Sequence, residues 1–418
     1  MTLGHARINI AKYYALLMSA MACVSLVLSV PLFMQERERI AKGYGDFIIF
    51  YTGAQMLKVG AGSKLYDLRT QKDFQDKFDV PIRTGPLPFN HPPFELLWFL
   101  PLTSLEYFKA YQIWSVLNIA FLAGVLVFLA PPLARRFWPM FILMFAGFYP
   151  ATVTLLHGQD SILLTFLMAA AIRALKFSKD RTAGVLLAVG LFKPQLILPT
   201  ILVLIVNRRW AAMLSFLATS VTLAAVSIKL VGVAGVRQYL ELLAQIDRAH
   251  YTIAPGNMPN LRGFIYSLVG LREPVFFQAL LITLSAGFLV ALLYYAKNSL
   301  AEREQRFDLT VCLTVLVTLI TSYHLYIHDL TLLLIPVVLA IKSTLISPVK
   351  LSLHQRVILS LILVFWIPFL FSYQPLLARE QMSLGFLGVV LFATLIAASL
   401  RRRLKTNRQP GFRTTSEL

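Results

Sequence analysis

The stretch KYYALLMSAMACVSLVLSVPLFM, residues 12–34, determines the class of fold. Only its first residue is charged, and its length suits a helix that crosses a hydrocarbon core of about 30 Å. The run is too long for the apolar part of a signal peptide and has no clear cleavage site. We therefore expect a transmembrane helix here.

The rest of the chain repeats this pattern. Of its 418 residues, 57% are hydrophobic and 14% are charged, whereas a soluble domain carries roughly 25% charged residues. We expect an all-α polytopic integral membrane protein with about ten to twelve transmembrane helices, some of them short or re-entrant. The further full spans are expected at 106–130, 137–155, 161–175, 211–231, 273–296, 307–322, 330–346, 356–371 and 383–400.

Two apolar segments depart from simple spans. HPPFELLWFLPLTSL, residues 91–105, is short and interrupted by proline, which favours a short or re-entrant helix. The run 182–206 contains LFKPQ and has basic turns at both ends. Because proline lacks a backbone donor and disfavours helix at the preceding residue, we expect two short helices that meet at Lys193 and Pro194.

The net charge of +19 does not indicate nucleic-acid binding, because the basic residues lie mostly in short turns between apolar runs. Cytoplasmic loops collect lysine and arginine during membrane insertion. With the N-terminus in the cytoplasm, the outer segment 35–95 nets only +1. The inner segments net +16 together: 1–12, 131–136, 176–181, 207–210, 297–308, 342–356 and 401–418.

This orientation gives a single transmembrane domain, residues 1–400, and a basic cytoplasmic tail, residues 401–418. A first outer loop at 35–92 and a second outer segment at 232–272 follow from it. The polar clusters that insertion does not explain then share the outer face, which predicts a catalytic cavity there. They are Asp46, NHPPF (90–94), HGQD (157–160), FKPQ (192–195), the segment 232–272 and YHLYIHD (323–329).

Lys193 is the first candidate for chemistry. An ammonium inside an apolar run is costly and usually lines a space filled with water or substrate. A cation beside a helix break suits a phosphate oxygen. The alternative is a lysine that extends to the lipid headgroups from the tip of a hairpin.

His324, His328 and Asp329 form the second candidate group. The two histidines share a face if this stretch is helical, and with Asp329 they would suit a metal site, a proton relay or a phosphate clamp. Two histidines alone indicate zinc weakly, because zinc sites need three or four ligands. Asp329 could equally cap the helix that follows.

Four further residues carry weaker signals. Arg262 could bind a phosphate from the outer side, and Gln159 could contact a substrate. Asp160 is expected to cap the helix after it. His91 precedes two prolines and is expected to set the entry angle of a short helix, with any substrate contact secondary.

Asp46 follows the first span, and apolar residues come directly after it. A partly desolvated carboxylate is a better proton acceptor, and a positioned base is worth about 10²–10⁴-fold in rate. Position alone would favour an ordinary solvated loop acid.

The ordered series of segments over about 40–210 resembles glycosyltransferase family 87, and the later YHLYIHDL fits the same pattern. The segments are GDFIIFYTGAQMLKVGAGSKLYD (45–67), FNHPPFELLWFLPLTSL (89–105), YQIWSVLN (111–118), HGQDSILLTFLMAAA (157–171) and AGVLLAVGLFKPQLILP (183–199) with NRRW (207–210). Residues 211–310 contribute no motif.

The resemblance implies a GT-C-like fold and an inverting hexosyltransferase that uses a polyprenyl-phosphate sugar, with mannose as the family default. It implies Asp46 as general base, with Lys193, His324 and Arg262 at the donor phosphate. We expect His91, Gln159, His328 and Asp329 at the cavity or acceptor, and no obligatory metal or other cofactor.

The expected partners are the lipid-linked donor, a lipid or glycan acceptor and membrane lipids. The expected location is a bacterial inner membrane, with both termini cytoplasmic and the active site on the outer face. A transporter or flippase for a lipid-linked or anionic solute would also explain an intramembrane lysine and histidines. A non-catalytic assembly factor would leave Asp46 without a role.

Overall fold

The computed structural model describes residues 2–78, 85–130, 137–249, 258–269, 274–297, 299–300, 304–345, 351–367 and 384–406. Over these ranges the regular elements are all helices, which confirms an all-α membrane protein. Six helical segments there are long and apolar enough to cross a membrane: Lys12–Pro31, Tyr107–Leu129, Trp210–Gln245, Val275–Ala296, Ile327–Thr344 and Gly385–Arg402. Of the other expected spans, 356–371 begins in a shorter helix, α15 (Leu353–Val364). α9 (Pro194–Val206) is the second helix of the expected broken pair.

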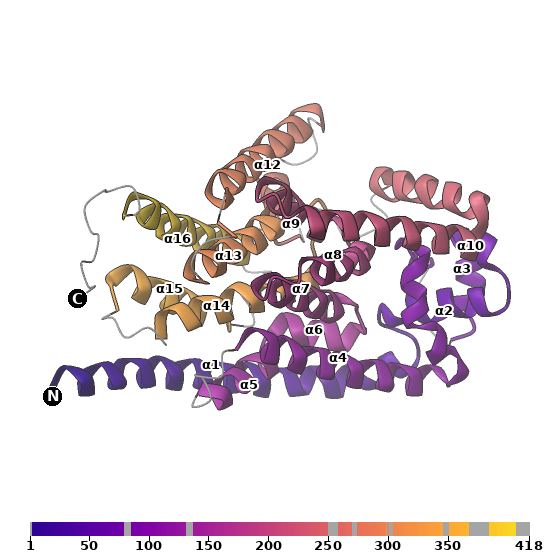
Figure 1. Cartoon of the computed structure of the whole chain (residues 1–418). Coiled ribbons are helices and arrows are strands. Elements are labelled where there is room, and N and C mark those ends of the chain that lie inside the picture. Colours follow the sequence, from indigo (N-terminus) through magenta and orange to yellow (C-terminus); the bar gives the residue numbers. More distant parts are fainter. Residues whose placement is uncertain are drawn as a thin grey trace.

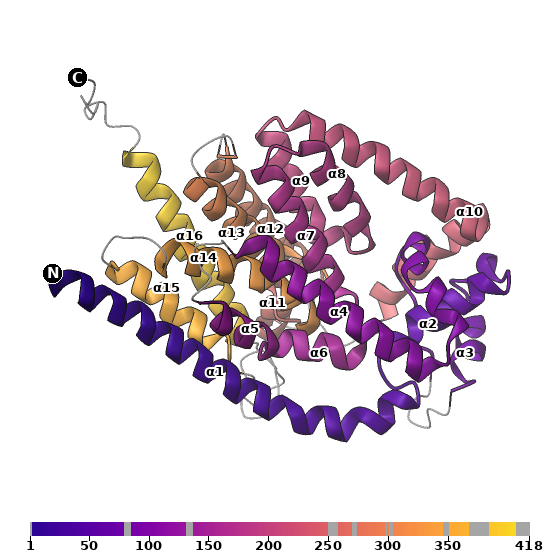
Figure 2. The ribbon, with the colours of Figure 1, turned by 60° about the horizontal axis from the view of Figure 1, so that its bottom comes forward.

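Two long helices flank the molecule. α1 (Thr2–Ala41) extends the first expected span in both directions. α10 (Trp210–Ala249) continues past the expected end at Val231, with a kink at Gly232, where φ is 71° and ψ is 172°. Figures 1 and 2 show α1 and α10 on opposite flanks, both reaching the end that holds α2 (Phe47–Lys58) and α3 (Leu68–Gln75). The first part of the expected second outer segment is therefore helical.

The expected span 137–155 is broken in its middle. It consists of α5 (Trp138–Ala146) and α6 (Tyr149–His157), which are bent by 50° relative to each other. A Cβ at Gly147, between them, would lie 2.1 Å from the carbonyl oxygen of Ala22, so α1 crosses directly on the bend. Pro150 lacks the N–H that would continue the hydrogen-bond ladder of α5. The bend directs the end of α6 toward α2.

Proline also divides the segment before α4 (Tyr107–Leu129). In place of one short helix, residues 91–105 form two 3-10 helices, η2 (Pro93–Trp98) and η3 (Leu100–Ser104). Each has a proline in its first two positions, where a missing N–H costs nothing. A further 3-10 turn, η1 (Gly62–Lys64), packs against α10.

The predicted break at Lys193 and Pro194 is confirmed. α7 (Ser161–Lys176) is followed by α8 (Asp180–Val189), η5 (Gly190–Phe192) and α9. Lys193 Nζ lies 2.7 Å from Ser161 Oγ at the start of α7, whereas Arg209 Nη1, after α9, lies 3.2 Å from Asp180 Oδ1. α8 and α9 therefore form a re-entrant hairpin with its tip at Lys193.

α13 (Glu304–Thr321) is the centre of the core. It is buried on every side from Arg306 to Ile320, as suits a helix without a polar face. Around it pack α9, α12 (Pro274–Ala296), α14 (Leu334–Leu345) and α16 (Leu384–Thr406). α11 (Leu261–Val269) precedes α12, and η7 (Ile327–Leu333) connects α13 to α14.

Ion pairs join three of the expected inner turns. Lys342 Nζ lies 2.6 Å from Glu304 Oε1 and 2.7 Å from Asp308 Oδ2, and Lys176 also pairs with Glu304. Lys176 ends α7, whereas Ser161 begins it beside the tip of the hairpin. The ion-paired inner turns and the polar residues around Ser161 and Lys193 therefore lie at opposite ends of α7, a helix about 24 Å long.

Candidate active site

Asp46 lies directly before α2, where a carboxylate commonly caps a helix, but it makes no capping hydrogen bond. Its Oδ2 instead accepts a hydrogen bond from Gln159 Nε2 at 2.8 Å. The same oxygen lies 3.5 Å from His157 Nδ1. The Asp46 side chain is 27% exposed, so the carboxylate is oriented by donors at the edge of the protein interior.

The pKa of Asp46 lies below its usual range. Burial alone would raise this pKa, but the hydrogen bonds from His157 and Gln159 and the charge of His157 outweigh burial. Asp46 is therefore ionised at neutral pH, but the same contacts make it a weaker base than an ordinary carboxylate.

Gly158 fixes the turn that carries both donors. Its φ of 65° is left-handed and ends α6. A Cβ at Gly158 would lie 2.6 Å from the Cβ of Phe47, the first residue of α2. Trp114 Nε1 donates to the Gly158 carbonyl at 3.0 Å. The close backbone approach places His157 and Gln159 against Asp46.

Gly158→Ala should therefore lower both stability and activity. A left-handed non-glycine residue costs about 1–2 kcal/mol, and the clash with Phe47 adds to this. We expect a lower Tm in thermal unfolding of the detergent-solubilised protein. Gly287→Ala is the control, because a Cβ at that position in α12 meets nothing within 4 Å. Equal Tm values for the two variants would show that the turn adapts freely.

Lys193 lies at the centre of a charged network. Its Nζ lies 2.6 Å from Asp160 Oδ1 and donates to Ser161 Oγ and Asp329 Oδ1, both at 2.7 Å. Of the three N–H groups of this ammonium, two therefore donate to Ser161 and Asp329, and Asp160 is held as an ion pair. Lys193 is only 5% exposed, and a phosphate oxygen would have to displace one of the three.

Asp160 was expected to cap α7, and that expectation is wrong, because its side chain makes no capping hydrogen bond. Asp160 is fully buried and pairs with Lys193 on one oxygen. Its other oxygen, Oδ2, lies 3.4 Å from His91 Nδ1. Two cations within 4 Å explain why this carboxylate turns away from the helix amides.

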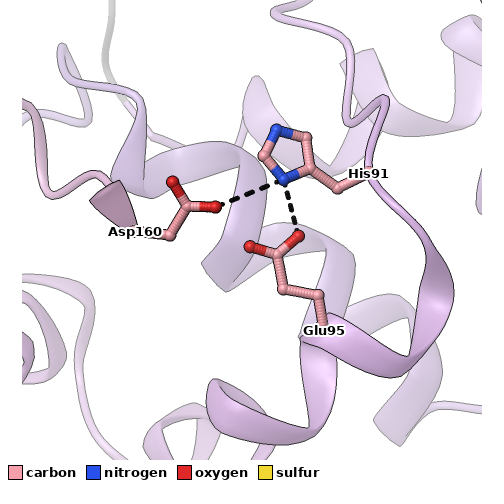
Figure 3. A group of neighbouring side chains, drawn as sticks. All are labelled: His91, Glu95 and Asp160. Atoms are coloured by element: carbon pink, nitrogen blue, oxygen red, sulfur yellow. Dashed lines mark hydrogen bonds and ion pairs between the residues drawn. The ribbon is translucent and has the colours of Figure 1, made fainter. Parts of the chain in front are cut away.

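His91 joins the network to the first loop (Figure 3). Its Nδ1 lies 2.6 Å from Glu95 Oε2 as well as facing Asp160. Burial opposes the charged imidazolium, but Glu95 and Asp160 raise the pKa of His91 above its usual value. Burial raises the pKa of Glu95. The three residues therefore form a proton-sharing group in which Glu95 and Asp160 are fully buried and His91 is partly exposed.

His91, Glu95 and Asp160 are also the residues that could hold a metal ion. They offer one ligand atom each, all within 4.8 Å of one another. The same atoms are already engaged, since Asp160 pairs with Lys193 and His91 bonds to Glu95. A divalent cation would have to displace protons from this group and would lie next to an ammonium. The present contacts favour protons there.

His324 and His328 would share a face only in a continuous helix, and this stretch is not one. His324 lies in a bend after α13, and His328 lies in the 3-10 turn η7. His328 Nε2 lies 3.7 Å from Asp329 Oδ2, which also accepts from the backbone N–H of Tyr326 at 3.0 Å. His328 and Asp329 therefore belong to the network around Lys193.

His324 instead lies with Arg262. The Arg262 guanidinium stacks 3.9 Å over the Tyr323 ring, and its Nη1 lies 3.5 Å from His324 Nδ1. Arg262 is 5% exposed. Two expected phosphate-binding residues are thus adjacent, in a second group beside η7.

The structure brings most of the expected site residues together. One group joins Asp46 to His157 and Gln159, and another joins Lys193 to Asp160, Asp329, His328, His91 and Glu95. The two groups adjoin, because Gln159 and Asp160 are consecutive residues and the charge of His328 acts on Asp46. Glu95 was missed by the sequence reasoning. Its signal was an acid in an apolar segment, four residues after His91, a spacing that allows contact within a helical turn.

The fold and this site define a multi-pass helical membrane protein with a buried acid–base network at one end. Residues 89–322 match the model of glycosyltransferase family 87, and the chain belongs to that family. The matched range contains His91, Gln159, Lys193 and Arg262, whereas Asp46 lies before it. No curated protein and no solved structure matches the chain.

Proposed function

We propose that this membrane glycosyltransferase moves a hexose, with mannose as first choice, from a polyprenyl-phosphate carrier to a hydroxyl of a lipid or glycan. Asp46 carries the proposal, because it is an ionised, partly exposed carboxylate whose orientation two donors fix. The acceptor O–H gives its proton to Asp46 while its oxygen attacks C1 of the sugar. The bond from C1 to the phosphate oxygen breaks, and the anomeric centre inverts.

The leaving phosphate gains negative charge, and preorganised cations stabilise that change. Arg262 and His324 are our candidates for direct contact, since they adjoin each other at η7. Lys193 belongs to the same electrostatic environment, with its N–H groups engaged by Asp160, Asp329 and Ser161. His91, Gln159, His328 and Asp329 would shape the acceptor side of the site, and we propose no metal.

The carrier chain would stay in the lipid, with the reaction on the outer face of a bacterial inner membrane. Both termini would then be cytoplasmic, and residues 1–400 would form one catalytic domain. Most of the inner segments are basic. Four residues from three of them, Lys176, Glu304, Asp308 and Lys342, meet at the opposite end of α7 from the site.

The hairpin argues against a transporter. Alternating access requires elements that move past each other, whereas Lys193 fastens the tip of the hairpin to α7 and η7. Arg209 and Asp180 pair with each other and close the base of the hairpin itself. The tip of the hairpin is therefore tied to its neighbours.

The test is sugar transfer by the purified protein in lipid nanodiscs. Radiolabelled polyprenyl-phosphate mannose and a bacterial membrane lipid extract serve as donor and acceptors. We expect the label to move to a new lipid or glycan product with release of polyprenyl phosphate. Movement of intact donor across sealed vesicles without cleavage would instead support the transporter, and labelling from a nucleotide sugar alone would contradict the donor class.

A further inference from the structure

His157 is a histidine at the edge of the site, and the chemistry proposed above uses it only as one of two donors to Asp46. It ends α6, and its side chain is 43% exposed. The Gln159 amide already supplies Asp46 with one hydrogen bond at 2.8 Å. His157 therefore adds a second contact to a carboxylate that is already bonded.

Both contacts go to the same atom. Gln159 Nε2 and His157 Nδ1 lie 2.8 Å and 3.5 Å from Asp46 Oδ2. In the described part of the chain, the polar contacts recorded for this carboxylate all involve Oδ2. A carboxylate fixed through one oxygen has a defined orientation for the other. Oδ1 is thus the oxygen available to a substrate hydroxyl.

We propose that His157 is a positioning residue for the base: with Gln159 it holds Oδ2 of Asp46, so that Oδ1 receives the proton of the acceptor hydroxyl. This inference rests on the proposed function of Asp46 as general base. His157 touches neither the sugar nor the phosphate in this scheme and acts through the carboxylate.

The backbone supports a dedicated contact. Gly158 approaches Phe47 so closely that only glycine fits, and a Cβ on Gly45 would lie 3.2 Å from the His157 carbonyl oxygen. Two glycines thus press the end of α6 onto the residues around Asp46. The C-terminal end of a helix also favours a protonated imidazole. Position and charge therefore both favour donation from His157 to the carboxylate.

The contact has a measurable effect on titration. His157 lowers the pKa of Asp46, whereas burial raises it. A base with a lowered pKa stays ionised until the pH falls through that low value. Without His157 the pKa of Asp46 should rise, so that activity is lost earlier as the pH falls. The other titratable group that acts on Asp46 from a neighbouring element is His328 on η7. His328→Asn is therefore measured in parallel.

The experiment compares kcat/KM against pH for wild type, His157→Ala and His157→Asn, with radiolabelled polyprenyl-phosphate mannose and the lipid extract. We expect His157→Ala to move the acid limb upward by about one pH unit or more, with the donor KM unchanged. Asparagine keeps an N–H donor without charge, so His157→Asn should move the limb less. The control is His354→Asn, because His354 contacts Ser399 instead.

Two outcomes would overturn the inference. A uniform fall in kcat/KM at every pH would assign His157 a structural role, and a profile identical to wild type would assign it none. If His157→Ala does not fold, the pH profiles of kcat/KM for His157→Asn and His157→Gln are compared with that of wild type in its place. The Asp46→Asn variant distinguishes failure of the proposed base from failure of this inference. If Asp46→Asn still transfers sugar, Asp46 is not the base. If Asp46→Asn is inactive but the pH profiles of the His157 variants match wild type, only the positioning role of His157 is rejected.

Discussion

Asp46→Asn should reduce the rate of sugar transfer by about 10²–10⁴-fold, the usual contribution of a general base. Asparagine retains a carbonyl oxygen that can accept the hydrogen bond from Gln159, so the turn around Gly158 should keep its place. The loss should therefore appear in kcat, with the donor KM and the Tm close to those of wild type. Initial rates with the labelled donor and thermal unfolding of the same preparation measure these quantities.

Asp67→Asn is the matched control for this prediction. Asp67 also lies in the first loop and directly precedes a helix, but it caps α3 by accepting from Thr70 N at 2.7 Å. We expect its variant to lose some stability and to keep its transfer rate. If the two variants were equally active, Asp46 would be a structural acid and the proposed mechanism would fail.

Lys193→Met should destabilise the protein more than any other single change considered for this site. It leaves the Asp160 and Asp329 carboxylates buried without their shared cation, and removing one member of a buried ion pair costs about 3–5 kcal/mol. We expect a large drop in Tm and in the yield of folded protein. Lys229→Met is the control, because Lys229 is exposed on α10. If Lys193→Met lowered the Tm no more than Lys229→Met does, this prediction would be contradicted.

A second variant separates stability from phosphate binding. Lys193→Met combined with Asp329→Asn removes one of the stranded charges, so part of the lost Tm should return. The donor KM of this double variant then indicates the role of Lys193. An unchanged donor KM supports a positioning role, and a strongly raised one supports direct contact with the phosphate.

The sequence predicted the membrane architecture because apolar length and charge are local properties. The run at residues 12–34 and the break at Lys193 and Pro194 could be recognised without knowledge of any neighbour. The continuation of α10 past its kink could not, because a glycine such as Gly232 marks a break in a helix and does not show that a second helical segment follows. The bend at Gly147 likewise depends on the close crossing of α1.

The candidate site was predictable as a set of residues and not as a set of contacts. An acid after the first span, a lysine in an apolar run and residues of the polar turns all take part in the observed groups of contacts. Their partners depend on tertiary distances, and for that reason Asp160 could be mistaken for a helix cap. Lys193 and Asp329 are separated by 136 positions in the sequence, and no periodic pattern of residues predicts contact over such a distance.

That separation also sets an order for biogenesis. The ribosome completes the α8–α9 hairpin long before it synthesises Asp329, so the emerging lysine has one of its two carboxylate partners and lacks the other. An ammonium without adequate counter-charge is expensive at depth in lipid, so the nascent hairpin should remain near water, or be sheltered by the insertion machinery, during this interval. Arrival of η7 supplies the missing anion, and only then can the hairpin settle at its final depth.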